Sequence, residues 1–264
     1  MGIPFYLSNS NMPKNICNSS GCSPKQRGVW WQSQDISKYS SCEYRSTQPK
    51  DVYFKLARRY CVFVFGLFIM ALGIALSIRA DMGITPISSL PYVVSLGVPL
   101  TVGMLTILLH AGFLLIEFLL MRREFEGIQL LQLAAAVVFG ACIDCTLALT
   151  EWLVPGNYPE QWLLLVVSCV LLSIGICFEV APNVLMMASE GMITAAVRRF
   201  HAEFGMVKIV VDVSLVVSSI VLSLLMFSTV YGVREGTVAA AILVGVCVKI
   251  VKMPVYAAVA RIIR

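Results

Sequence analysis

Charged residues are scarce in this sequence. Asp, Glu, Lys and Arg make up 13% of its 264 residues, about half of the share of roughly 25% that is usual in a soluble domain. Apolar residues make up 58%, and the mean hydropathy is +0.84. The sequence therefore lacks the polar surface of a soluble globular protein, and its composition predicts a membrane protein.

Histidine and the common catalytic motifs are also scarce or absent. The sequence has two histidines, which excludes a histidine-rich metal site. It contains no HExxH, GxSxG or Walker A motif, so we expect no enzyme, no catalytic residue, no metal and no cofactor. Cys142 and Cys145 form a CxxC pair that is expected to be two small buried side chains. A thiol–disulfide exchanger is the alternative, and it would require the pair to lie at an aqueous edge.

The polar residues gather at the N-terminus. Residues 1–54 are rich in Ser, Asn, Lys and Gln, a composition typical of a disordered tail. Residues 55–264 are predicted to form the membrane domain. The net charge of +5 does not indicate nucleic-acid binding, because the basic residues lie at the ends of apolar segments rather than in a stripe with aromatics between them.

Six long apolar segments follow the tail. They lie at about 60–78, 101–121, 128–150, 161–181, 206–228 and 237–256, and each is close to the roughly 20 residues that a helix needs to cross a bilayer. Most Lys and Arg residues fall on one side of these segments, whereas the loop 151–160 carries Glu151 and Glu160 and no basic residue. The positive-inside rule then predicts a multi-pass protein of the cell inner (cytoplasmic) membrane with both termini cytoplasmic.

Two further segments have features of short, broken helices. Residues 79–100 are too apolar for a solvated loop and too rich in Gly and Pro for a plain span. Thr85 and Pro86 predict a helix start, with Thr as the N-cap and Pro at the first position. Residues 181–204 have the same character. Such breaks commonly dip into a membrane domain, where protein or water satisfies their backbone.

The two halves of the membrane domain correspond when the chain is shifted by about 102 residues. Gly73 and Gly103 are 30 residues apart, as are Gly175 and Gly205. Three spans per half is an odd number, so the second half would enter the membrane inverted. We therefore predict an all-α membrane protein of two inverted three-helix repeats, about 60–150 and 161–256, each with a short broken or re-entrant helix.

Several motifs resemble those of the YczE/YyaS/YitT group of bacterial membrane proteins. They are GIALSIRADMGITP at 73–86, FGACID at 139–144, an acid at Asp212 and GVREGT at 232–237. The similarity covers about residues 58–258. Ile87 and Ser88 depart from it, because related proteins often have an aromatic residue and an acid there. The resemblance implies a multi-pass bacterial membrane protein and supplies no substrate.

Polar residues inside or beside the spans are the candidate site, because they are costly in a membrane. Alternatives stay open for most of them: an ion pair with Lys249 for Asp144, an ion pair with Lys208 for Asp212, a packed ring for His110, and a wet inner position for Glu179. The full set of candidate substrate-binding residues is Arg79, Asp81, Thr85, Ser88, Ser89, His110, Asp144, Glu179, Asn183, Glu190, Asp212 and Lys249.

The predicted function is a secondary transporter or permease for a small solute, with its site between the two halves. The alternative is a non-transporting membrane sensor or assembly partner. The expected partners are the lipid bilayer and a small-molecule solute. A homodimer stays open, and nucleic acid is not expected.

Overall fold

The computed structural model describes residues 49–122, 125 and 127–263, all of whose regular elements are helical. The predicted disordered tail lies mostly outside the described residues. Helix α2 (Pro49–Ala80) begins within the segment assigned to that tail, because the helix extends beyond its apolar part.

Six of the helices are long and apolar enough to cross a membrane, which confirms the six predicted spans. They are α2 (Pro49–Ala80), α4 (Val102–Met121), α5 (Leu131–Leu149), α6 (Tyr158–Val180), α8 (Phe204–Phe227) and α9 (Glu235–Ile263). A short 3-10 helix, η2 (Gly127–Leu130), leads into α5.

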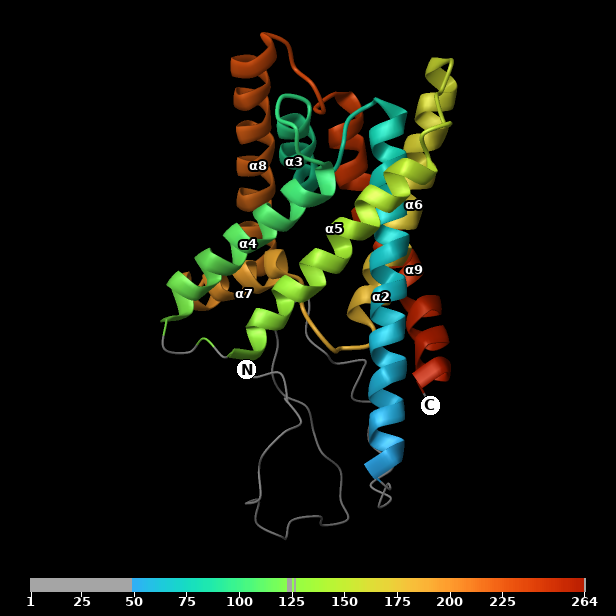
Figure 1. Ribbon diagram of the computed structural model, residues 1–264, viewed down its shortest axis with the longest axis vertical. Helices are drawn as coiled ribbons and strands as arrows, with labels where there is room; N and C mark the ends of the chain where they lie inside the picture. The colour runs from blue at the N-terminus through green and yellow to red at the C-terminus, as the bar shows by residue number, and fades with distance from the viewer. Residues whose placement is uncertain (1–48, 123–124, 126, 264) are drawn as a thin grey trace. The chain divides into compact units, whose positions relative to one another are not determined.

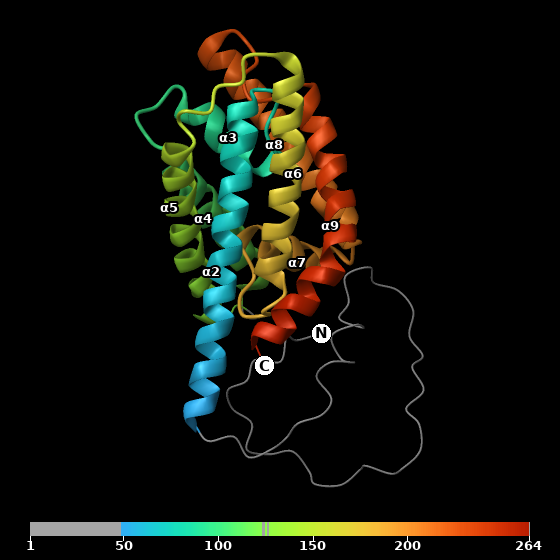
Figure 2. The ribbon, with the colours of Figure 1, turned by 90° about the vertical axis from the view of Figure 1, so that its right-hand side faces the viewer.

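Helices α2 and α6 form a tightly packed antiparallel pair (Figures 1 and 2). Glycines allow the close approach. A Cβ on Gly73 would lie 2.7 Å from Leu172 Cγ, and a Cβ on Gly175 would lie 2.8 Å from Met70 Cβ. Because the pair is antiparallel, α2 and α6 end at opposite ends of it, which we call the Arg79 end and the Glu179 end.

The two short segments are helices that begin after breaks in the chain, as predicted. Helix α3 (Pro86–Ser95) has Thr85 as its N-cap and Pro86 at its first position, and α7 (Ala188–Phe200) follows a loop after α6. Helix α3 packs against α8, and α7 packs against α4 (Figure 1). Each short helix therefore contacts a long helix from the other half of the sequence.

The remaining contacts differ between the two halves. Helices α4 and α5 pack against each other where Gly103 and Gly140 face one another, with no room for a Cβ on either. The corresponding glycines of the second half, Gly205 and Gly245, have no atom within 4 Å of a Cβ position. Helices α8 and α9 are the least buried of the six long helices.

We expect a cysteine at Asn157 to react with an impermeant thiol reagent added outside intact cells, once the nine native cysteines are replaced. Asn157 is exposed just before α6, in the loop that the positive-inside rule places outside. The control is a cysteine at Arg199, exposed near the end of α7, which should react only after permeabilisation. The opposite pattern would invert the predicted topology.

Candidate functional site

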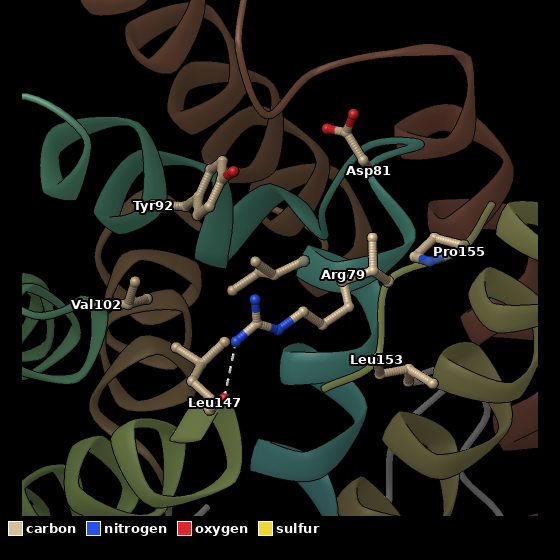
Figure 3. Close-up of a pocket in the computed structure, with 9 residues that line it drawn as sticks. Arg79, Asp81, Tyr92, Val102, Leu147, Leu153 and Pro155 are labelled. Carbon is tan, nitrogen blue, oxygen red and sulfur yellow. Dashed lines mark hydrogen bonds between the residues drawn. The ribbon is translucent and has the colours of Figure 1, made fainter. Parts of the chain in front are cut away.

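A cleft of about 390 Å³ opens at the Arg79 end. Figure 3 shows how side chains from several elements meet there. Two of them are charged, one is a phenol and the others are apolar. They are Ile78, Arg79, Asp81, Tyr92, Val102, Leu147, Leu153, Val154 and Pro155.

Arg79 is the cation of this cleft. One of its terminal nitrogens donates a hydrogen bond of 2.9 Å to the carbonyl oxygen of Leu147 in the last turn of α5. Arg79 itself lies in the last turn of α2, so its positive charge is near the negative ends of two helix dipoles. Its Nε is buried and has no hydrogen-bond partner within the described part of the chain, which leaves one donor unused.

Asp81 lies at the rim, and its carboxylate points away from Arg79 (Figure 3). It is 3.5 Å from the guanidinium of Arg234, which also donates a 2.8 Å hydrogen bond to the Asp81 carbonyl. Two backbone hydrogen bonds connect the segment between α2 and α3 to the region where α8 and α9 are joined. The Ile84 N–H donates to the Gly232 carbonyl, and the Gly236 N–H donates to the Met82 carbonyl. Asp81 is therefore held by Arg234, and among the described residues no carboxylate pairs with Arg79.

Tyr92 of α3 is a cleft residue that the sequence did not single out. Burial raises the pKa of its phenol, and nearby Asp81 adds to the effect. The phenol therefore stays protonated at neutral pH and can donate a hydrogen bond. A guanidinium, a phenol and apolar walls together suit a small organic anion.

The hydroxyl groups at the start of α3 form hydrogen bonds with neighbouring residues of the same segment. Thr85 Oγ1 donates to Ser88 Oγ at 3.3 Å, and Ser89 Oγ donates to the carbonyl of Pro86 at 2.7 Å. Ser88 and Ser89 are buried. None of the three lines the cleft.

The second break carries two acids at the Glu179 end. Glu179, the next-to-last residue of α6, is buried rather than exposed to water, and only 3% of its surface is accessible. It accepts a hydrogen bond from the Met187 backbone, while its Oε1 has no hydrogen-bond partner in residues 49–122, 125 and 127–263. Glu190 lies in the first turn of α7, close enough to Glu179 for their charges to interact. Asn183 is exposed in the loop, with a positive φ of 50°.

Asp144 does not form the ion pair with Lys249 that was left open as an alternative to a site role. Its Oδ2 accepts a 2.7 Å hydrogen bond from Thr101 Oγ1, and its Oδ1 accepts a 2.8 Å hydrogen bond from the Gly103 backbone. Lys249 is exposed on α9. Asp144 lies in the last turns of α5, level with the start of α4, because the two helices run antiparallel. It therefore caps α4 instead of lying deep in its span.

His110 and Asp212 have the local contacts predicted by their purely structural alternatives, a packed ring and an ion pair with Lys208. The His110 ring is buried, with Nδ1 2.8 Å from the carbonyl oxygen of Thr106. It packs edge to face against Phe113 and Phe139. Asp212 pairs with Lys208 at 3.2 Å, one helical turn earlier.

Sequence reasoning missed Glu117 and Gln132. Both are buried at the Glu179 end, on α4 and α5 respectively, with 2% and 5% of their surfaces exposed. The available signal was a lone acid inside an apolar span, two helical turns after His110 and hence on the same face.

No curated protein and no solved structure matches the chain. Residues 57–253, which cover the two breaks and most of the six spans, match the family of unknown function DUF6198. The specific resemblance to the YczE/YyaS/YitT group stays a prediction. The match extends over most of the chain, and the protein therefore belongs to the DUF6198 family.

Proposed function

We propose that the protein is a secondary transporter or permease for a small organic anion. The observation that carries this proposal is the position of two buried polar side chains. Arg79 and Glu179 lie at opposite ends of the α2–α6 pair, each next to a chain break, and each has a buried polar atom without a partner. Polar and ionisable side chains without full hydrogen bonding are costly inside a membrane domain and are commonly kept for function.

The packing supports two inverted repeats. The contact of Gly73 with Leu172 has its counterpart, 102 residues on, in the contact of Gly175 with Met70. The contact of α3 with α8 likewise has its counterpart in the contact of α7 with α4. Reciprocal contacts of this kind are expected from a pseudo-two-fold axis in the membrane plane, and such repeats with broken helices are common in transporters.

In this proposal a solute enters the cleft at the Arg79 end. Its anionic group binds the guanidinium of Arg79 and the phenol of Tyr92, and its apolar part contacts Val102 and Leu147. The two repeats then rock about the α2–α6 pair and open the Glu179 end. The proposed location is the cytoplasmic membrane, with the Arg79 end outside.

We expect saturable uptake of a small carboxylate by proteoliposomes, in a screen that also contains sugars and organic cations. Arg79→Gln should lower kcat/KM by about 100-fold, because the lost charged hydrogen bond is worth roughly 1.5–3 kcal/mol. Arg79→Lys should retain part of the activity.

The matched control is Arg261→Gln, which removes an exposed charge of the same type in the last turn of α9 and should leave uptake unchanged. If folded wild-type protein transports no member of the anion panel, the proposal fails. The alternative of a sensor or assembly partner would then be favoured.

A further inference from the structure

The helices of the two halves begin at corresponding residues. Helix α7 begins 102 residues after α3 (188 against 86), and α8 begins 102 residues after α4 (204 against 102). The break before each short helix contains a residue with a positive φ, Asp81 at 51° and Asn183 at 50°, which are again 102 residues apart. Helices α5 and α9 correspond with a shift of 105, which aligns Gly140 with Gly245. A contact in one half therefore suggests a counterpart in the other.

One helix contact lacks its counterpart. The contacts α2–α5, α3–α4 and α3–α8 correspond to α6–α9, α7–α8 and α4–α7, and all of these are present. Helices α4 and α5 also pack closely, but among the described residues their counterparts α8 and α9 do not pack against each other. In the view of Figure 1, α8 and the C-terminal half of α9 lie on opposite sides of α2. The two halves thus differ in whether their last two long helices meet.

The residues that would meet between α8 and α9 have complementary side chains. At the α4–α5 contact, the Thr101 hydroxyl donates a hydrogen bond to the Asp144 carboxylate. The shifts of 102 and 105 lead from Thr101 to Glu203 and from Asp144 to Lys249. Glu203 is the N-cap residue of α8, as Thr101 is of α4. A hydrogen-bonded pair in one half therefore corresponds to a pair of opposite charges in the other.

Glu203 and Lys249 are available for such a contact. Both are exposed, and the ion pairs within the described part of the chain are formed by other residues. Lys249 lies halfway along α9, one of the six long apolar helices. A lysine so far from the ends of a membrane helix is unfavourable unless it reaches water or a partner. An acid at the start of α8 would supply that partner.

We propose that α8 and α9 close on each other in a second conformation of the protein, with Gly205 against Gly245 and the Lys249 ammonium paired with the Glu203 carboxylate. An ammonium group cannot accept a backbone hydrogen bond, as Asp144 does from Gly103. The α8–α9 contact is therefore weaker than the α4–α5 contact, which suits a contact that forms and breaks. The contact itself does not depend on transport. As the step that closes the Glu179 end while a solute enters at the Arg79 end, it rests on the proposed function.

Cross-linking of the full chain in membranes tests the proposal. Glu203→Cys and Lys249→Cys are combined in a chain whose nine native cysteines are replaced, and a short bifunctional thiol reagent is added. A protease site in the exposed stretch 228–231 distinguishes a link within one chain, which holds the two fragments together, from a link between two copies. We expect a link within one chain. Thr101→Cys with Asp144→Cys is the positive control, because these side chains are already in contact.

The matched negative control pairs Glu203→Cys with Ile250→Cys. Ile250 is exposed on α9, and its counterpart Cys145 is exposed on α5 rather than packed against α4. Ile250 would therefore face away from the proposed contact, and this pair should cross-link much less.

Gly245→Val should lower cross-linking of the Glu203→Cys and Lys249→Cys pair about tenfold, since overpacking commonly shifts an equilibrium by such a factor. The described conformation should tolerate the change, because a Cβ on Gly245 meets no described atom within 4 Å. Gly112→Val on α4, where a Cβ has equally open surroundings, should leave cross-linking unchanged.

A carbodiimide provides a second measurement on the chain without cysteine substitutions. It condenses a carboxylate and an amine in contact to an amide and takes up the released water as a urea. We expect mass spectrometry to detect an amide between Glu203 and Lys249, and Gly245→Val should lower its yield.

The proposal is overturned if neither reagent links residues 203 and 249 within one chain above the level of the negative control. Equal linking with and without Gly245→Val, or a link only between two copies, would also overturn it. A failed uptake screen would leave the cross-linking result standing, so the two failures are distinguishable.

Discussion

Replacing Gly175 with valine is expected to lower the free energy of unfolding by about 3 kcal/mol, at the upper end of what overpacking usually costs. A Cβ at this position would lie 2.6 Å from the Met70 backbone nitrogen and 2.8 Å from Met70 Cα. The obstacle is backbone, so no side-chain rotation relieves it, and α2 and α6 must separate. For a chain of this size the expected fall in Tm is roughly 6–12 °C.

The matched control is Gly245→Val on α9, where a Cβ meets nothing within 4 Å. Both changes add the same atoms to the same residue type in a long helix, so helix propensity cancels in the comparison. Gly73→Val should resemble Gly175→Val, because a Cβ there would lie 2.9 Å from the Leu172 backbone nitrogen. Equal Tm values for Gly175→Val and Gly245→Val would show that α2 and α6 do not pack as described.

Asp144→Ala is expected to reduce stability by about 2–3 kcal/mol. The change removes the acceptors of the hydrogen bonds from Thr101 and from the Gly103 backbone, and it takes a negative charge from the N-terminus of α4. Asp144→Asn should cost less, about 1 kcal/mol, because its remaining carbonyl oxygen still accepts one of the two bonds. Thermal or denaturant unfolding of the purified protein measures both.

A double-mutant cycle with Thr101→Val checks the cause. The two substitutions remove the same hydrogen bond, so their combined effect should be smaller than the sum of the single effects. Asp212→Ala is the control acid, because it removes only a half-exposed pair with Lys208, which is worth less than about 1 kcal/mol. Additive effects of Asp144→Ala and Thr101→Val would contradict the capping role. A site role for Asp144 would predict loss of solute binding with normal stability.

Part of the candidate site was predictable because it depends on local spacing. Lys208 and Asp212 are four residues apart on a helix and must lie on one face, and the structure has them paired. Arg79 and Asp81 were found because they flank a break visible in the Gly and Pro pattern. Tyr92 was not found, since an aromatic residue in an apolar segment has the same appearance in a sequence whether it lines a cleft or faces lipid.

The sequence by itself determined the six spans, the two short helices and the start of α3 at Pro86. These depend on hydropathy over about 20 residues and on the fixed φ of Pro86 at the first helical position, since the Thr85 side chain makes no capping hydrogen bond. The tertiary structure alone decided which side chains meet. Asp144 caps α4 rather than pairing with Lys249, and Glu117 and Gln132 converge on Gly191. Such contacts are set by the crossing and register of helices far apart in the chain, and in a membrane that packing depends on where small residues allow two backbones to approach.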